Sequence, residues 1–526
     1  MSRPEPDLLY HSYFSISLKD NSNELSGDDD EFENILLGSN YPTDSIRTTN
    51  FNHSPDLVFD NTLGRITANA TGTYLFVYQL VFESTQITNI SLFVRKNGSD
   101  EFYTAGTRAF AQLEHCTTTC HGLIDLVAGD YLEVGASTDN EQEFIVNTGT
   151  NFTLLKANGD YGNVKYTENA SAGAINTLEV IGDTQAAAGG GTVVTNLKNV
   201  SISNGLMTPS NTRPFLAFAT LVGEHSATSG ETELGIYANG SAIDDTSVLI
   251  HSNSDPDAQS FALLKNLTGG QTASGRYKAS STKTIATKNG SSFTIFDVSN
   301  NSGNSNPSAF LSFSIDGDSS ALNGNDATLF KDDVYSSYST VTHATATGIT
   351  YSSNTGTFVP ASSGKYFVVI NLIIGDLGAN RDFGLDIQKN GTDIYVSTLH
   401  LRSQFDPQEK TLCLILDADA GDSFTFILGN DGSDSSVEIK SGTTISMFKV
   451  DDLKELHAES VPTDSLIADD FTINSFSAAG LSPQYNRLET EQVPFSLGIR
   501  GPMSLRGRPT NTDGTPSNIS TGTKKT

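Results

Sequence analysis

The sequence predicts an all-β protein, and two observations carry that prediction. Short runs that alternate apolar and polar residues recur along the chain, each followed by a turn rich in Asn, Gly, Asp or Ser. No long segment repeats apolar residues at the i, i+3, i+4, i+7 spacing of an amphipathic helix. With 526 residues the chain is too long for one hydrophobic core, so we expect several domains.

The charge balance and the N-terminal segment limit the classes of partner. Acidic residues outnumber basic ones 61 to 31, which gives a net charge of −30. Nucleic acids and anionic membranes need a basic face, so we expect neither as a partner. The start, MSRPEPDLLYHSYF, lacks the basic and apolar regions of a signal peptide, and no apolar stretch of about 18 residues occurs. We therefore expect neither secretion nor membrane insertion.

Three copies of one unit account for most of the chain. An Asn-Gly pair follows an alternating run at Asn97 and Gly98, at Asn239 and Gly240, and at Asn390 and Gly391. A second glycine follows each pair's Gly by 31, 30 and 30 residues, and a third follows after 20, 20 and 21 more. An aromatic residue opens a strand 24 or 25 residues before the Gly of each Asn-Gly pair: Tyr74, Phe215 and Tyr366.

The copies recur after 142 and then 151 residues, so each is a whole domain rather than a solenoid repeat. The predicted organisation is an N-terminal arm (1–10), three domains (11–157, 175–298 and 307–451) and a C-terminal arm (452–526). The two linkers between the domains are short, polar and turn-forming.

The third copy shows a resemblance to a known family most clearly. NTGTFVPASSGKYFVVINL, LDIQKNGT, LDADAGDSFTF and TTISMFKV follow in order. This pattern resembles the tumour-necrosis-factor/complement globular-head jelly roll, which phage virion proteins also use. The first copy keeps most of the motif. The second departs most, with Gln271 in place of the Asp and Arg213-Pro214 in place of the Gly before the aromatic. The resemblance implies three tandem antiparallel jelly-roll β-sandwiches followed by an irregular C-terminal arm.

The resemblance also implies threefold assembly. Tyr74, Phe215 and Tyr366 would lie in the core or at a trimer axis. Two arrangements fit: a homotrimer, which the habit of the family favours, or a pseudo-trimer made by the three copies of one chain. The Asn-Gly pairs should form tight hairpin turns, because Asn and Gly accept the positive φ that such turns need.

The segment HCTTTCH, His115 to His121, concentrates two cysteines and two histidines. In the register of the repeat, Cys120 aligns with Phe261 and Leu412, so we expect a buried, unreactive cysteine. His121 should point to the opposite face of the strand.

Cys116 aligns with Asp257 and Gln408, which predicts an exposed loop position before the strand. Four residues of extended strand span about 13 Å, whereas a disulfide needs Cα atoms within about 7 Å. The register therefore favours no special chemistry, with a local disulfide and a zinc site as the alternatives.

Other chemistry is not indicated by motifs. There is no G-x-S-x-G, H-E-x-x-H or P-loop, so we expect no enzyme, catalytic residue, cofactor or metal. The oxygen-rich segment Asp316 to Phe330 could cradle calcium, although it lacks the twelve-residue loop spacing.

The C-terminal segment differs from the rest of the chain. Residues 492–526 hold five bases and one acid, giving +4 in a chain of −30. One interpretation is a disordered end held loosely by charge. The other is an anchor arm that orders on a capsid or adaptor subunit, with apolar residues in grooves and arginines on carboxylates: Phe495, Leu497, Ile499, Arg500, Leu505, Arg506 and Arg508.

These features favour a virion structural protein, such as a phage head fibre, capsid decoration or tail-appendage protein, located in the virion. Its partners would be other virion subunits, with a host-surface glycan as a further partner. The alternative is a secreted or surface lectin-like or complement-like binding protein, which the missing signal peptide and scarce cysteines disfavour.

Overall fold

Most of the chain between residues 12 and 450 is described by the computed structural model. The described residues are 12–25, 32–42, 46, 48–84, 86, 88–104, 107–109, 116–139, 142–169, 178–183, 193–225, 232–248, 257–279, 284–299, 307–322, 326–335, 337–375, 381–401, 408–430 and 437–450. Tyr10–Leu453 forms one compact unit. The predicted N-terminal arm and C-terminal arm lie outside the described residues.

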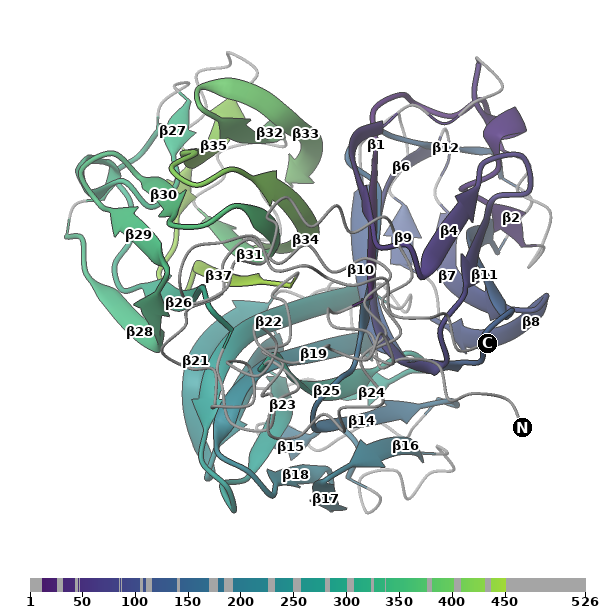
Figure 1. Ribbon diagram of the computed structural model, residues 1–526, viewed down its shortest axis with the longest axis horizontal. Helices are drawn as coiled ribbons and strands as arrows, with labels where there is room; N and C mark the ends of the chain where they lie inside the picture. Colours follow the sequence, from purple (N-terminus) through teal and green to yellow (C-terminus); the bar gives the residue numbers. More distant parts are fainter. Residues whose placement is uncertain are drawn as a thin grey trace, which may run out of the picture. The chain divides into compact units, whose positions relative to one another are not determined.

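The predicted fold class is confirmed. Six antiparallel sheets pair into three β-sandwiches, and the inner sheets of the three sandwiches share one strand order, as do the outer sheets (Figure 1). Each sandwich encloses its own apolar core, which includes Phe76 in the first, Phe215 in the second and Phe358 in the third. Alternating side chains explain the arrangement, because one face of each sheet must be buried against another.

Jelly roll 1 has an inner and an outer sheet. The inner sheet runs β10 (Cys116–Leu126), β6 (Gly72–Ser84), β13 (Asn151–Lys156), β1 (Tyr13–Leu18) and β3 (Thr48–His53), with β12 (Phe144–Val146) also on β6. The outer sheet runs β4 (Leu57–Asp60), β5 (Arg65–Ala68), β11 (Tyr131–Thr138), β7 (Thr88–Lys96) and β8 (Ser99–Tyr103), with β2 (Glu33–Asn34) on β11 and β9 (Thr107–Ala109) on β7. One 3₁₀ turn, η1, covers Gly38–Asn40.

Jelly roll 2 repeats this order. Its inner sheet runs β22 (Asp257–Leu267), β19 (Arg213–His225), β25 (Ser292–Asp297), β14 (Tyr161–Tyr166) and β16 (Val193–Lys198), with β24 (Ile285–Thr287) on β19. Its outer sheet runs β17 (Val200–Ser203), β18 (Leu206–Pro209), β23 (Ala273–Ala279), β20 (Thr232–Ala238) and β21 (Ser241–Val248), with β15 (Glu179–Val180) on β23.

The start of jelly roll 2 corrects a predicted boundary. Residues 158–174 were expected to be a linker, but β14 lies inside this segment and pairs with both β16 and β25. Only four residues therefore separate β13 from β14. The sequence did not predict this strand, because Tyr161 to Tyr166 is a short alternating run within a polar segment that contains Gly.

Jelly roll 3 completes the set. Its inner sheet runs β34 (Gln408–Ala418), β31 (Gly364–Gly375), β37 (Thr444–Lys449), β26 (Phe310–Ile315) and β28 (Thr340–Thr347), with β36 (Glu438–Ile439) on β31. Its outer sheet runs β29 (Ile349–Ser352), β30 (Thr357–Pro360), β35 (Phe424–Asn430), β32 (Arg381–Lys389) and β33 (Thr392–Leu401), with β27 (Ala327–Thr328) on β35. The 3₁₀ turn η2 covers Asp332–Val334.

The repeated glycines have a common backbone reason. Each Asn-Gly pair lies at the hairpin between two outer strands, and both of its residues have positive φ, with values of 50° to 53° for Asn and 77° to 80° for Gly. Gly129, Gly270 and Gly421 have φ between 84° and 98°, although a Cβ there would meet nothing within 4 Å. The backbone conformation alone therefore requires glycine at these three positions.

The Asn-Gly and Gly-Asp landmarks recur together because the Asn-Gly hairpin tip touches the turn that connects the inner sheet to the outer sheet. Asn390 donates its Nδ2 to Asp422 Oδ1 (2.7 Å) and accepts the main-chain N–H of Ser423 (2.9 Å). Asp422 also accepts the N–H of Asp419. In jelly roll 2, Gln271 takes over this last role, because its Oε1 accepts the N–H of Thr268 at 3.0 Å.

Asp422→Ala should lower the free energy of unfolding by about 1–2 kcal/mol, because it leaves the tip N–H and Asn390 without their acceptor. Hydrogen bonds from Lys389 and Asn390 lower the pKa of Asp422 to about 2, so this stabilisation should persist above about pH 4 and fade as the pH falls toward 2. Urea titration is the measurement. Asp422→Gln is the matched control and should retain most of the stability, and equal losses in the two variants would contradict the role assigned to Gln271.

Candidate functional site

The three jelly rolls meet along three edge strands. β10, β22 and β34 each end the strand order of an inner sheet, so among the strands that the structure describes one side of each has no β-ladder partner. β10 contacts β22, and β22 contacts β34, so the three strands lie together in the middle of the unit (Figure 1). An unpaired strand edge buried inside a protein must find other hydrogen-bond partners.

A buried apolar cluster joins the three domains. Its residues come from all three inner sheets: Tyr13, Leu75, Val77, Leu123, Leu155, Leu216, Phe218, Ala262, Leu264, Phe296, Val298, Phe310, Ala344, Phe367, Val369, Cys413, Ile415, Phe448 and Val450. We call this set the axis cluster. The repeat register makes Leu123, Leu264 and Ile415 equivalent, so they form one layer of it.

Three equivalent hydroxyls form a closed ring of hydrogen bonds next to that layer. Ser260 Oγ donates to Thr119 O (2.8 Å), Thr119 Oγ1 donates to Thr411 O (3.3 Å), and Thr411 Oγ1 donates to Ser260 O. Each residue lies ten positions before the repeat glycine of its own domain. The three bonds run from jelly roll 2 to jelly roll 1, from 1 to 3, and from 3 back to 2. The three domains of one chain are therefore related by threefold pseudo-symmetry.

Side chains of neighbouring domains satisfy other groups of the open strand edges. Asn371 accepts the N–H of Ala262 with Oδ1 (3.0 Å) and donates Nδ2 to the carbonyl of the same residue. The N–H of Ile415 donates to Ser15 Oγ (3.2 Å), and its carbonyl accepts Asn52 Nδ2 (2.9 Å). The edges are thus covered by polar side chains rather than by further strands.

The three jelly rolls of this single chain pack against one another around the axis cluster, which is the packing that the pseudo-trimer arrangement predicts. The same inner flank of every jelly roll is buried against another jelly roll of that chain. Contacts outside the axis cluster support the same packing: Tyr395 OH donates to Gly149 O (2.8 Å), and Lys165 Nζ donates to Glu101 O (2.8 Å).

The strand-opening aromatics are core residues of their own sandwiches. Tyr74, Phe215 and Tyr366 are fully buried, and each belongs to the core of one jelly roll rather than to the axis cluster. The residues that follow them, Leu75, Leu216 and Phe367, are the ones on the axis. Because side chains alternate along a strand, a shift of one residue separates core from axis.

The HCTTTCH segment lies in β10 as far as it is described. His115 is outside the described residues, and Cys116 begins the strand, paired with Phe82, rather than lying in a loop before it. Cys120 is buried in the core of jelly roll 1, which raises the pKa of its thiol. None of the three cysteines is in a disulfide. Within the described ranges, no three His, Cys, Asp or Glu side chains are grouped to hold a metal.

His121 points away from that core and into the seam with jelly roll 2, on the face opposite Cys120. Its ring stacks on Phe218 with centroids 5.0 Å apart, and Nδ1 lies 2.7 Å from Thr220 Oγ1. Nε2 lies 3.4 Å from Ser292 Oγ. Complete burial lowers the pKa of His121 to about 3, so the ring is neutral at ordinary pH.

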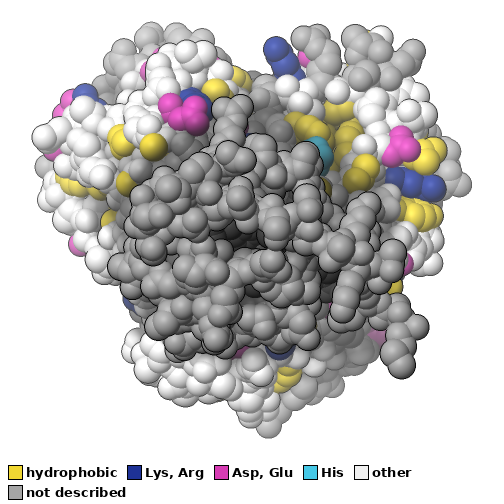
Figure 2. Space-filling view, viewed as in Figure 1, with side chains coloured by type: hydrophobic (Ala, Val, Ile, Leu, Met, Phe, Trp, Pro, Cys, Tyr) yellow, Lys and Arg dark blue, Asp and Glu magenta, His cyan; other side chains and the backbone are white. Residues whose placement is uncertain are grey.

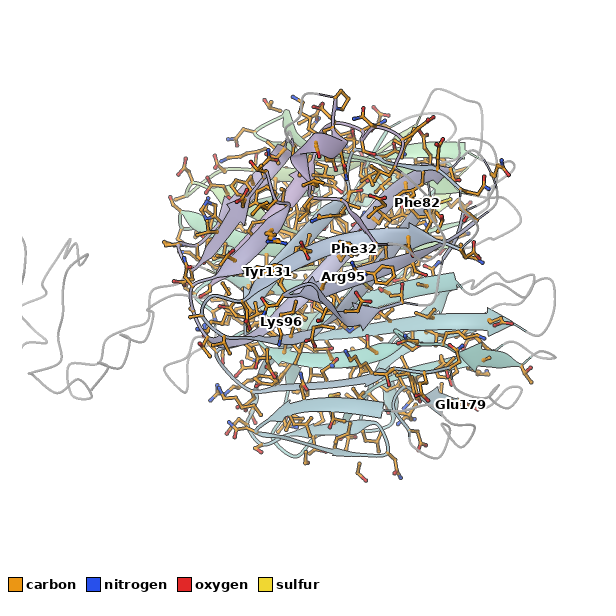
Figure 3. All side chains as sticks on the ribbon, turned by 90° about the vertical axis from the view of Figure 1, so that its right-hand side faces the viewer. Phe32, Phe82, Arg95, Lys96, Tyr131 and Glu179 are labelled. Carbon is orange, nitrogen blue, oxygen red and sulfur yellow. The ribbon has the colours of Figure 1, made fainter. Side chains whose placement is uncertain are left out.

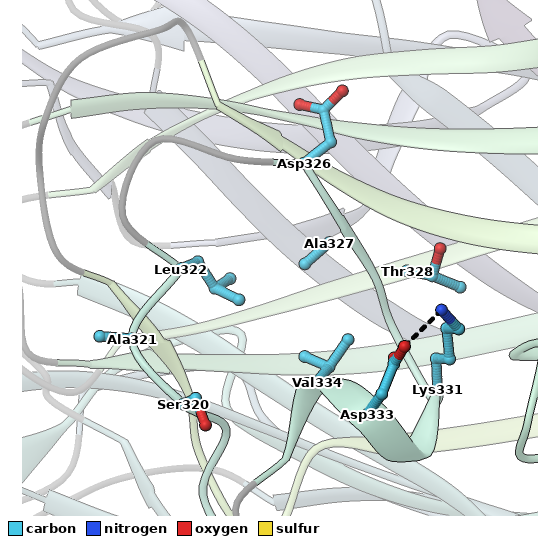
Figure 4. A pocket seen from close by; sticks show the side chains of 9 residues that line it. All are labelled: Ser320, Ala321, Leu322, Asp326, Ala327, Thr328, Lys331, Asp333 and Val334. Carbon is cyan, nitrogen blue, oxygen red and sulfur yellow. Dashed lines mark hydrogen bonds and ion pairs between the residues drawn. The ribbon is translucent and has the colours of Figure 1, made fainter.

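Jelly roll 3 carries an open pocket that is lined mainly by the segment considered for calcium (Figure 4). Its volume is about 360 Å³, and Lys331 and Asp333 form an ion pair of 2.6 Å on its wall. Asp326 also lines it, and residues 323–325 lie outside the described residues. Burial, together with the charges of Asp393 and Asp326, raises the pKa of nearby Asp386 to about 6.

Two surface features lie away from the axis, both on jelly roll 1. On its outer sheet Arg65 pairs with Glu133 (3.0 Å) and Arg95 pairs with Asp100, while Arg95 also lies over the ring of Phe32 (Figure 3). On another face, the half-exposed ring of Phe51 contacts His53 and Phe59. Figure 2 shows one face of the molecule, on which hydrophobic side chains gather beside a histidine.

The hydroxyl ring is the feature of this candidate site that the sequence analysis missed. Its signal was present, because Thr119, Ser260 and Thr411 share one register position and all carry a hydroxyl. The anchor arm residues Phe495, Leu497, Ile499, Arg500, Leu505, Arg506 and Arg508 lie outside the described residues. In the part of the chain that the structure describes, no helix has the length and apolarity needed to cross a membrane.

Comparison with known proteins gives structural matches alone. No protein-family model matches the chain, and no curated protein matches it. Murine APRIL at pH 8.0 is 17% identical over 28% of this chain and 98% of its own, with a TM-score of 0.21. Eiger TNF from S. frugiperda is 13% identical over 28% of this chain and 91% of its own, with a TM-score of 0.20. A β-porphyranase from Bacteroides plebeius is 11% identical over 49% of this chain and 38% of its own, with a TM-score of 0.16.

Proposed function

We propose that the chain is a virion structural protein: a pseudo-trimeric block of three jelly rolls, displayed on a particle and attached through its C-terminal arm. The observation that carries this proposal is the closed ring of hydroxyls on the axis. A chain that covers its own open strand edges forms a rigid unit that needs no further copy to complete its core.

The attachment is assigned to the C-terminal arm by its composition. Residues 492–526 have a net charge of +4. Because the whole chain has a net charge of −30, residues 1–491 have a net charge of −34. The run Phe495, Leu497 and Ile499 alternates with Ser and Gly, as in a segment that adds to another subunit's surface. Arginines in the same arm would pair with carboxylates of a capsid or adaptor subunit.

Truncation after Glu491 should leave the three jelly rolls folded but remove the protein from assembled particles. Circular dichroism checks folding, and immunoblotting of purified particles checks incorporation. Phe495→Ser with Leu497→Ser is the matched full-length variant, because it keeps the charge and the length of the arm. It should also reduce incorporation, since the apolar contacts are lost.

Three outcomes separate the possibilities. Normal incorporation of the truncated protein would show that the arm is not the anchor and would direct attention to residues 1–10. Absence of the wild-type protein from every particle fraction would contradict the virion assignment and favour the lectin-like or complement-like alternative. A soluble, folded truncated protein that is missing from particles would support both the virion assignment and the arm.

A further inference from the structure

We propose that each jelly roll recognises the next one through a different side-chain set at one register position, so that the ring closes in a single order within one chain. The position lies eight residues before the repeat glycine and is occupied by His121, Ala262 and Cys413. The opposing position lies five residues after the strand-opening aromatic and is occupied by Gln79, Thr220 and Asn371. This proposal does not depend on the virion assignment.

The seam between jelly rolls 1 and 2 pairs a large side chain with a small one. The ring of His121 fills the space beside Phe218, and its Nδ1 meets the hydroxyl of Thr220. Thr220 Oγ1 also lies 2.7 Å from Ser260 Oγ, which links this pair to the hydroxyl ring.

At the seam between jelly rolls 2 and 3 the small side chain lies on the edge strand and the larger one on the opposing strand, the reverse of the first seam. Ala262 has almost no side chain, so the longer Asn371 reaches its main-chain N–H and carbonyl. Asn371 Oδ1 also lies 2.9 Å from Thr411 Oγ1, which brings this second pair next to the hydroxyl ring. The aromatic Phe218 is replaced here by Val369, its register equivalent in the axis cluster.

The third seam has its own set. The register places Cys413 opposite Gln79 and Val77, and Cys413 and Val77 both belong to the axis cluster. Gln79 Oε1 accepts Asn151 Nδ2 at 3.1 Å. The three seams therefore carry His with Phe and Thr, Ala with Val and Asn, and Cys with Val and Gln.

Assembly of like domains would mismatch these sets. Three copies of jelly roll 1 would place His121 against Val77 and Gln79, so its ring would lose the stacked Phe218 and the hydroxyl of Thr220. Three copies of jelly roll 2 would place Ala262 against Thr220, which is too short to reproduce the bonds of Asn371. Lost packing contacts and unpaired buried groups both destabilise a packed interface. The short connection between β13 and β14 keeps jelly rolls 1 and 2 of one chain together.

The test transfers the second seam's pair to the first seam in the full-length chain. His121→Ala removes the stacked ring, and Thr220→Asn forces a longer side chain against His121, so each variant should lower Tm. In the double variant H121A/T220N, the new amide can reach the main chain of residue 121. Its Tm should therefore exceed the value expected from adding the two single shifts by at least about 2 °C.

Thr220→Ser is the matched control, because it keeps the hydroxyl and should leave Tm nearly unchanged. Hydrogen exchange measured by mass spectrometry separates ring opening from unfolding: the single variants should deprotect β10 and β22 while β7 and β11 stay protected. Light scattering should give the wild-type mass near the chain mass of 56.1 kDa. Additive Tm shifts, or a mass three times as large, would overturn the proposal.

Discussion

Lowering the pH from 6.5 toward 4 should destabilise the protein by opening the seam at His121. The pKa of this ring is about 3 in the folded chain and 6.5 in the unfolded chain, so the unfolded state binds the proton first. The contribution of the neutral His121 to the free energy of unfolding is therefore complete above about pH 6.5. It falls as the pH decreases and is lost below about pH 3. The full effect is about 4–5 kcal/mol. The partners that the structure places against the ring, Phe218, Thr220 and Ser292, do not titrate in this range.

Urea titrations at pH 8, 6.5, 5.5 and 4.5 measure this loss. His121→Ala is the control variant, with the residue that jelly roll 2 has at the same register position. It should be less stable than the wild type at pH 8, because a cavity replaces the ring, but its stability should change much less between pH 6.5 and 4.5. The paired carboxylates contribute mainly below about pH 5. Parallel pH profiles of the two proteins would show that another group is responsible.

The fold was predictable because its determinants are local and repeated. The Asn-Gly turn at Asn97 needs two residues of positive φ, and Gly129 needs one more, whatever packs around them. Such positions survive in all three copies, and the alternation between them specifies strands. The strand β14 was missed because its apolar residues, Val164 and two tyrosines, are few and its neighbours resemble a linker.

The axis could not be predicted to the residue. Tyr74 and Leu75 are adjacent and both apolar, and only the packing of whole sheets decides which of them faces the core and which faces the other domains. The bonds that close the ring join a side chain to the main chain of another domain, as Asn371 does with Ala262. The sequence of an edge strand does not indicate which side chain of another domain will bond its main chain. The hydroxyls of Thr119, Ser260 and Thr411 do indicate a shared polar layer, because they occupy one register position in the three copies.

The departure of the second copy from the repeat is explained by a compensating change on the neighbouring strand. In jelly roll 1, Gly72 leaves room for Lys156, whose side chain lies within 2.5 Å of where a Cβ at residue 72 would be. In jelly roll 2 the equivalent positions are Arg213 and Asp297. The arginine Nη1 lies 2.8 Å from Asp297 Oδ2, and this carboxylate is completely buried.

Replacing Arg213 by Ala should therefore lower the free energy of unfolding by about 3–5 kcal/mol, because it leaves the buried carboxylate of Asp297 without its cation. Ser299 would still donate its N–H and hydroxyl to Oδ1, and the N–H of Asp160 would still reach Oδ2, but none of these neutralises the charge. The control is the double variant R213A/D297N, which removes the charge while the amide oxygen keeps accepting from Ser299. Its stability should recover by more than half of the loss when both are measured by urea titration at pH 7. A loss below about 1 kcal/mol in Arg213→Ala, or no recovery in the double variant, would show that the ion pair does not stabilise jelly roll 2.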